Sequence, residues 1–313
     1  MIFVSLWYLL RMITIENIDP QRLDEKGRLS LQKLTEPKYY PCLEGQHPDE
    51  VTNAQVVLLV ALQNNQPLGL LVGSFVPILR SAELHSLFVD EKFRNQQIAS
   101  TLLQEFEKEL KKQKAIVVTF LYPVENAFSS IYENIFQKQN WEKPIPFSIQ
   151  CLIKNSFDAP WLNKPYPLPH GFHELYWRDL NETERDQLKS EADRQIIPGF
   201  LSPFGRNEKI IEPANSLVLI NEKRVIGWMI THRIAPDTIR YSSLYISPEW
   251  QHKGPAMRLL CDAIKYQTHS TIPWALFETN LSTTDKAWIK ALRERIMPYA
   301  HTTTHINQLW KKL

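Results

Sequence analysis

The sequence is poor in cysteine and glycine, and it has no excess of charge of either sign. It holds three cysteines, Cys42, Cys151 and Cys261, and nine glycines among 313 residues. The cysteines lie far apart and form no Cys-x-x-Cys pair, which argues against a disulfide framework and a metal site and favours a reducing cytoplasm. The 36 basic side chains nearly balance the 34 acidic ones, so the charge pattern does not favour nucleic acid or an anionic membrane as a partner.

The sequence also offers no convincing membrane span. The apolar run MIFVSLWYLL at residues 1–10 is shorter than the roughly 20 residues that a spanning helix needs. It lacks the basic start and the small-residue cleavage site of a secretion signal. Met12 follows, and MITIENID resembles the start of a β-strand. We therefore expect Met12 to be the initiator and residues 1–11 to be an artefact of the gene start; the alternative is an apolar segment packed on the core.

One pattern of strands and helices occurs twice along the chain. In the first half, apolar runs predict strands at 12–18, 56–62, 68–76, 82–89, 115–123 and 147–153, with helices near 98–110 and 126–139. In the second half, the same criteria predict strands at 172–177, 240–246 and 272–278, a hairpin over 215–234, and helices at 181–195, 256–267 and 281–296. A repeat of this length indicates an α/β protein of two tandem domains. We expect domains at 12–156 and 172–313, joined by a proline-rich linker at 157–171.

Each half has a short polar loop between a predicted strand and a predicted helix. The loop RNQQIA begins at Arg94, and QHKGPA begins at Gln251, which is 157 residues later. The free N–H groups and the dipole of a helix start form an anion site. Gly254 permits a positive φ, and Pro255 suits the first helical position. In the first loop Gln97 stands where Gly254 stands, and a left-handed Gln97 costs roughly 1 kcal/mol.

These loops, in this context, resemble the acetyl-CoA loop of the GNAT superfamily of N-acetyltransferases. That loop has the form Gln/Arg-x-x-Gly-x-Gly/Ala and joins the fourth strand to the third helix. Residues 251–256 match all three defined positions, and residues 94–99 match two of the three. The resemblance covers the chain from residue 12 and implies, in each half, a mixed, mostly antiparallel sheet flanked by helices. It implies transfer of an acetyl group from acetyl-CoA, as co-substrate and without a metal, to an amine of a small molecule or peptide.

The resemblance also implies which residues hold acetyl-CoA. The fourth strand would bind the pantetheine arm, and the loop would bind the pyrophosphate. The residues expected to do so are Phe88, Val89, Arg94, Gln96, Gln97, Ile98, Ala99 and Asn126 in the first half, and Tyr245, Ile246, Gln251, His252, Lys253, Gly254, Pro255, Ala256 and Asn280 in the second. Asn126 and Asn280 have an alternative role, because an asparagine after a strand also caps helices.

The candidate catalytic residues lie in the first half. Glu83, on the predicted fourth strand, is placed to accept a proton from the amine, and Tyr132, on the following helix, to protonate the departing thiolate. The alternatives are a solvated strand carboxylate and a core tyrosine. The family's usual tyrosine position falls on Phe136, which cannot donate a proton. The equivalent strand of the second half, 240–246, contains no carboxylate.

The two halves thus meet different requirements of the reaction. The second half has the better cofactor loop and the first half has the better catalytic carboxylate, so the sequence alone leaves the active half open. Two other functions remain compatible with the repeat. One is a module that binds CoA or a metabolite without turnover, or that only pairs domains. The other is an aminoacyl or peptidyl transferase on the same scaffold. The acceptor amine and the oligomeric state also stay open.

Overall fold

The computed structural model describes residues 13–48, 53–194, 197, 199–204, 208–222, 224–251 and 253–313. The expectation for residues 1–11 and Met12 falls outside these ranges. The chain divides into two compact units. The N-terminal unit runs to Phe147 and includes Ile306–Leu313, and the C-terminal unit is Ser148–His305. No helix within the described ranges is long and apolar enough to cross a membrane.

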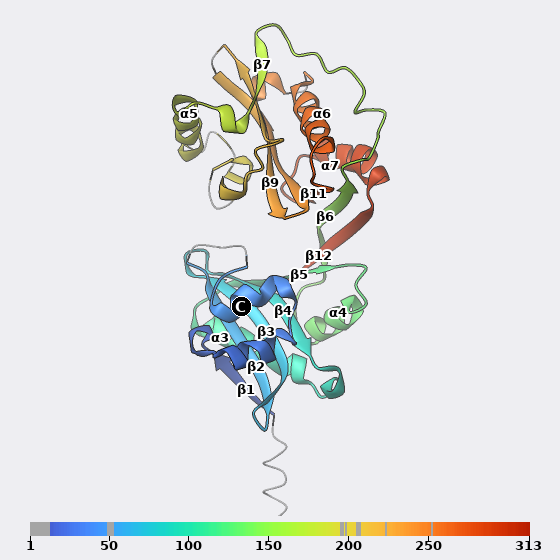
Figure 1. The fold of residues 1–313 in the computed structure, drawn as a ribbon. Coiled ribbons are helices and arrows are strands. Elements are labelled where there is room, and N and C mark those ends of the chain that lie inside the picture. Colours follow the sequence, from blue (N-terminus) through green and yellow to red (C-terminus); the bar gives the residue numbers. More distant parts are fainter. Residues whose placement is uncertain are drawn as a thin grey trace, which may run out of the picture. The chain divides into compact units, whose positions relative to one another are not determined.

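The N-terminal unit is built on a sheet with the strand order β1-β2-β3-β4-β5-β12 (Figure 1). Neighbouring strands run antiparallel, except for the parallel pair β4 and β5. In chain order the elements are β1 (Thr14–Ile18), α2 (Glu25–Gln32), β2 (Gln55–Gln63), β3 (Gln66–Val76), β4 (Ser81–Val89), α3 (Ile98–Lys112), β5 (Val117–Pro123), α4 (Ser129–Lys138) and, from the chain end, β12 (Thr302–Lys312).

Both faces of this sheet are buried. On one face, Phe106 of α3 shares a core cluster with Leu59. On the other face, α2 and the 3₁₀ segment Pro37–Glu44 bring Leu43 into a cluster with Leu58. Successive residues of a strand point to opposite faces. A strand covered on both faces therefore needs a continuous apolar run, which is what VVLLVAL provides.

The C-terminal unit repeats this plan with the strand order β6-β11-β10-β9-β8-β7. Here β10 and β11 form the parallel pair. In chain order the elements are β6 (Ile145–Lys154), β7 (Phe172–Tyr176), α5 (Glu182–Asp193), β8 (Leu217–Asn221), β9 (Arg224–Ala235), β10 (Thr238–Ile246), α6 (Pro255–Thr268), β11 (Trp274–Asn280) and α7 (Lys286–Ala291). Leu259 of α6 and Leu188 of α5 lie in the two core clusters of this sheet.

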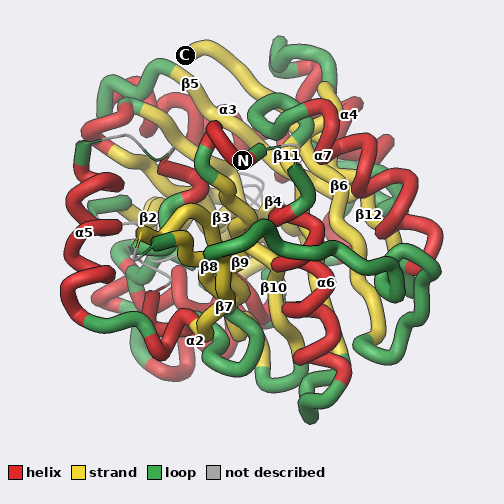
Figure 2. Tube along the Cα trace, turned by 90° about the horizontal axis from the view of Figure 1, so that it is seen from above, coloured by secondary structure: helices red, strands yellow, loops and turns green. Residues whose placement is uncertain are grey.

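Strands and helices mix throughout the described residues (Figure 2). This confirms the predicted α/β class, with two tandem domains of mostly antiparallel sheet flanked by helices. The structure adds a strand that the sequence did not indicate, β12. The helix predicted at 281–296 is shorter in the structure. α7 stops at Ala291, and a π-helical turn, Leu292–Ile296, follows it.

The last strand of each sequence half pairs within the compact unit that is formed mainly by the other half. Most of β6 lies in the C-terminal unit, where it pairs antiparallel with β11, and most of β12 lies in the N-terminal unit, where it pairs antiparallel with β5. The compact units therefore differ from the predicted domains 12–156 and 172–313. The physical reason is that β5 and β11 each need a partner on the side away from their parallel neighbour, and the chain supplies it from the other half.

The predicted linker at 157–171 has neither helix nor strand, but it is not a free connection. It lies within the C-terminal unit, and its Ala159, Trp161 and Leu162 are buried in the core cluster that includes α6. The prolines prevent regular structure, while the apolar side chains between them still gain from burial.

Candidate functional site

In each unit the two parallel strands diverge before they end. β4 pairs with β5 only over residues 81–84, and β10 pairs with β11 only over 238–241, although all four strands continue. We call the unpaired ends forks. The N-terminal fork is 85–89 with 121–123, and the C-terminal fork is 242–246 with 278–280. Each of these ends still pairs with the strand on its other side, and only the side that faces the fork is unpaired. On that side, backbone N–H and C=O groups are left for a ligand.

A β-bulge marks the start of each fork. On β4, Leu84 is opposite Gly73 and Ser86 is opposite Val72, which leaves His85 as the extra residue. On β10 the same shift leaves Ser242 as the extra residue. A bulge bends its strand and redirects a side chain.

The two cofactor loops have the same backbone turn. Gln97 precedes α3 with φ 62°, and Gly254 precedes α6 with φ 98°. Gln97 therefore adopts the left-handed backbone conformation that its alignment with Gly254 predicts. Neither residue places a side-chain cap on its helix. The first N–H groups of α3 are thus available to an anion. At α6, Pro255 has no N–H and the Met257 N–H already donates to the Gly254 carbonyl oxygen over 3.0 Å.

The first residue of each loop ties the loop to the end of its strand. The Arg94 Nε donates to the Val89 carbonyl oxygen over 3.2 Å, and the Gln251 side-chain amide donates to the Ile246 carbonyl oxygen over 2.9 Å. The Arg94 guanidinium also lies over the rings of Phe88 and Phe128. Both residues thus position the loop whether or not a phosphate is bound.

The remaining residues expected to hold acetyl-CoA lie around the loops and strand ends. Phe88, Ala99, Tyr245 and Ala256 are half-buried, Val89, Ile98, Ile246 and Pro255 are buried, and Gln96, Lys253 and Gly254 are exposed. His252 lies outside the described residues. The side chains of Asn126 and Asn280 accept backbone N–H groups of the turns that follow β5 and β11. These bonds close turns and do not cap a helix, because α4 has no side-chain cap at Phe128 and α7 is capped by Asp285.

At the start of the N-terminal fork, Glu83 lies beside a histidine that the sequence analysis missed. Glu83 Oε1 is 3.6 Å from His85 Nδ1, and His85 Nε2 is 2.9 Å from the Ser74 hydroxyl. The Glu83 side chain is 38% exposed, whereas His85 is 2% exposed. The rings of Tyr39 and His47 contact the His85 ring. Alternation along a strand suggests that residues 83 and 85 share a face, but the bulge at His85 that sets their contact gives no signal in the sequence.

Charged side chains of the loop at 94–99 and of the segment before β2 shift the pKa of the Tyr132 phenol. Burial, and then the Glu36 carboxylate, raise the pKa of Tyr132, while Lys38 and Arg94 oppose that rise. Its ring packs edge-on against Phe120. Phe136, at the family's usual tyrosine position, is instead fully buried between Phe120 and Trp141.

The C-terminal fork carries a different set of polar groups. The Ser242 hydroxyl is 2.7 Å from His232 Nδ1, and it accepts a hydrogen bond from Arg240 Nε over 3.1 Å. Burial, and then the Arg240 charge, lower the pKa of His232 to about 4. β10 contributes no carboxylate. Glu278 of β11 lies at this fork and accepts a hydrogen bond from Gln150 over 2.9 Å.

Comparison with known proteins agrees with this geometry. Residues 27–131, all in the N-terminal unit, match the acetyltransferase (GNAT) family model. A tandem GNAT protein from the clavulanic acid biosynthesis pathway superposes with a TM-score of 0.64 at 9% identity, over 96% of this chain and 98% of that one. The chain has the fold of a tandem GNAT protein. A GCN5-related N-acetyltransferase from Sphaerobacter thermophilus superposes with a TM-score of 0.58 at 14% identity, over 96% and 95%. No curated protein matches the sequence.

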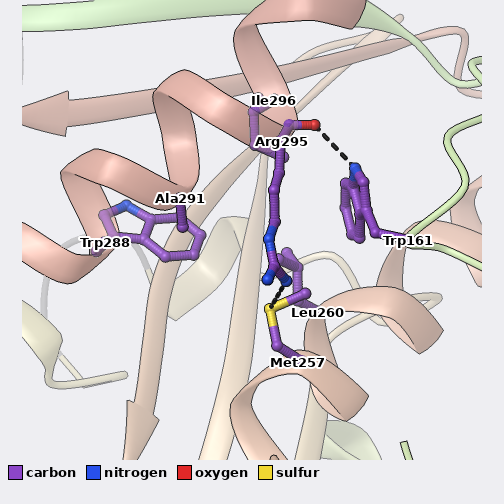
Figure 3. Close-up of a pocket in the computed structure, with 7 residues that line it drawn as sticks. All are labelled: Trp161, Met257, Leu260, Trp288, Ala291, Arg295 and Ile296. Atoms are coloured by element: carbon purple, nitrogen blue, oxygen red, sulfur yellow. Dashed lines mark hydrogen bonds between the residues drawn. The ribbon is translucent and has the colours of Figure 1, made fainter. Parts of the chain in front are cut away.

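The C-terminal unit also has a small hollow between helices. Figure 3 shows Trp161 among the side chains that line it, with the indole N–H donating to the Arg295 carbonyl oxygen over 2.9 Å. Arg295 reaches across toward the Met257 sulfur. The hollow leaves no room for a molecule of the size of water. Typical small-molecule pockets measure roughly 300 to 1,000 Å³, so we assign this hollow to packing.

Proposed function

We propose that this tandem GNAT protein transfers an acetyl group from acetyl-CoA to an amine of a small molecule or peptide, and that the N-terminal fork is the site of transfer. The observation that carries the proposal is the Glu83–His85 pair at the bulge where β4 leaves β5. It places a partly exposed carboxylate beside the unpaired strand end. The family match over residues 27–131 supports the same unit.

The chain's own groups would bind acetyl-CoA by its backbone. The uncapped start of α3 offers N–H groups to the pyrophosphate, and the unpaired end of β4 offers N–H and C=O groups to the pantetheine arm. Bound acetyl-CoA supplies the acetyl thioester. The left-handed Gln97 gives its loop the same turn as Gly254, so the missing glycine does not remove the cradle.

The proton transfers would then fall to two side chains. Glu83 accepts a proton from the ammonium group, which frees the nitrogen lone pair to attack the thioester carbonyl. The C–N bond forms, the C–S bond breaks, and Tyr132 donates its phenolic proton to the departing thiolate. The nitrogen loses its second proton as it becomes an amide, and this proton restores the Tyr132 phenol. A raised pKa suits Tyr132 to this step, because the phenol stays protonated through the neutral range.

The C-terminal fork fits this reaction less well. Arg240 occupies the position that Glu83 holds in the N-terminal unit, and a guanidinium repels an ammonium group. The helix after β11, α7, has the sequence KAWIKA and contains no tyrosine. We therefore place the transfer in the N-terminal unit alone.

A second candidate function is binding of acetyl-CoA without turnover. The observation that favours it is the burial of Phe136 in the aromatic core, where the family usually has a tyrosine. In that case the loop of the N-terminal unit would hold the cofactor and Tyr132 would serve packing only.

Calorimetry with acetyl-CoA, followed by a screen for release of free CoA, separates the two candidates. We expect binding to the wild type, and CoA release with at least one amine from a panel of polyamines, amino acids and aminoglycosides. Gln97→Asp should abolish binding at the N-terminal loop, and the matched Gly254→Asp tests the other loop. Absence of binding to the wild type would refute both candidates, while binding without CoA release from any amine would favour the second.

A further inference from the structure

The two forks carry opposite charges at the same position of the repeated fold. Arg240 is opposite His232 across β10 and β9, as Glu83 is opposite Ser74 across β4 and β3. Both lie one residue before the last parallel pair of their sheet. A carboxylate attracts an ammonium group and a guanidinium attracts an anion. The duplicated site thus keeps its geometry and reverses its charge preference.

Arg240 makes no ion pair within the described part of the chain. The hydrogen bond from its Nε to the Ser242 hydroxyl leaves the two outer guanidinium nitrogens for other acceptors. Among the acidic residues of the same unit, Glu212 is bound by Arg233 at 2.8 Å, and Glu278, at the same fork, accepts a hydrogen bond from Gln150 over 2.9 Å. The Arg240 side chain is half-buried at the start of the fork, where its charge is screened less than that of a fully exposed arginine.

The neighbouring serine and histidine hold the Arg240 side chain in place. His232 is buried, and with its lowered pKa it is neutral at pH 7. The Ser242 hydroxyl accepts a hydrogen bond from Arg240 Nε and itself donates to the Arg240 backbone carbonyl oxygen over 3.3 Å, with His232 Nδ1 2.7 Å away. The outer edge of a guanidinium fixed in this way suits the two oxygens of a carboxylate, because an arginine fork bonds both at once.

We propose that the C-terminal fork binds the carboxylate of a small organic acid, which pairs with Arg240, and that this fork is not a second site of amine acetylation. The proposal goes beyond the function assigned to the N-terminal unit and does not depend on it. It gives the second copy a ligand of its own, chosen by charge.

Calorimetry on the full chain at pH 7 and constant ionic strength tests this with succinate as the probe. Succinate should bind the wild type, and Arg240→Gln should weaken binding about tenfold or more. Arg240→Lys should fall between them, because an ammonium cannot bond both oxygens in the fork geometry. Arg224→Gln, an exposed arginine on β9 of the same unit, is the matched control and should bind as the wild type does. Glu83→Gln should also leave the succinate affinity unchanged.

Several results would overturn the proposal. These are no succinate binding to the wild type, equal binding by Arg240→Gln, and equal losses in Arg240→Gln and Arg224→Gln. Inorganic phosphate serves as a second probe, and tighter binding of phosphate than of succinate through Arg240 would replace the carboxylate by a phosphate ligand. Thermal unfolding of each variant shows whether it is folded. If the Arg240→Gln variant does not fold, the Arg240→Lys variant still tests the proposal.

Discussion

The imidazole of His85 lies 2.9 Å from the hydroxyl of Ser74, across the strands β4 and β3. The same contact recurs in the second unit with the partners exchanged, because there the histidine is His232 on β9 and the serine is Ser242 on the bulge of β10. The duplicated fold has thus kept a hydroxyl–imidazole contact at its bulge while exchanging the residues. Among the residues that the structure describes, a carboxylate, Glu83, lies beside the N-terminal contact alone.

Glu83→Gln should lower kcat of acetyl transfer by about a hundredfold or more, since a general base contributes that order of magnitude. Glutamine keeps the size of the side chain and loses the proton acceptor. Calorimetry should find acetyl-CoA affinity unchanged, because Glu83 is not among the residues expected to hold the cofactor. The exposed Glu91→Gln, on the 3₁₀ turn after β4, is the matched control. Equal kcat in Glu83→Gln and wild type would remove Glu83 as the base.

Tyr132→Phe should lower kcat about tenfold or more while leaving KM for acetyl-CoA nearly unchanged. The ring keeps its packing on Phe120, so the melting temperature should stay near that of the wild type. Because the pKa of Tyr132 is raised, its ionisation should not limit the wild-type rate below about pH 10. Tyr266→Phe, a half-exposed tyrosine of α6, is the control. Wild-type rates in Tyr132→Phe would favour the packing role.

The loops were predictable from sequence because their signals are local. A strand, a polar loop and an amphipathic helix follow one another within about twenty residues, and the positive φ of Gln97 follows from its alignment with Gly254. The charge difference between Glu83 and Arg240 could also be read once the strands were aligned. These features depend on neighbours along the chain.

The exchange of β6 and β12 and the role of His85 were not predictable in the same way. Which strand pairs with β5 depends on contacts between residues far apart in sequence, and β12 is rich in threonine with few buried apolar residues. His85 reads as one residue of an apolar strand. Its position beside Glu83 depends on a bulge, and the bulge is set by the register of β4 against β3.

Lys311→Met should destabilise the N-terminal unit by about 3 kcal/mol or more, because removing one partner of a buried ion pair leaves the other charge uncompensated. Lys311 of β12 bonds Glu107 of α3 at 2.6 Å, and Glu107 also accepts from the Trp141 indole. Lys312→Met, on the same strand, should change little. Denaturant unfolding followed by Trp141 fluorescence measures both. Equal stability of the two variants would contradict a role for β12 in fixing this unit.

Glu174→Gln should make stability less dependent on pH in the C-terminal unit. Burial, and then the neighbouring Asp262, raise the pKa of Glu174 to about 7, with Arg258 opposing. The folded state then holds a proton that the unfolded state has lost between about pH 4.5 and 7. This contribution to stability is present below that range and is lost as the pH rises through it. Denaturant unfolding of variant and wild type should therefore diverge with rising pH, in favour of the variant. Parallel pH profiles would rule this out.

His232→Asn should remove an opposite pH dependence. The pKa of His232 is about 4 in the folded unit, against an ordinary value of 6.5, so between these values the unfolded chain binds a proton that the folded unit does not. The contribution is fully present above about pH 6.5 and is lost as the pH falls toward 4, by up to about 3 kcal/mol. Denaturant unfolding of wild type and variant from pH 4.5 to 7.5 should therefore converge at the acid end. A constant difference across that range would show that His232 is not held neutral beside Arg240.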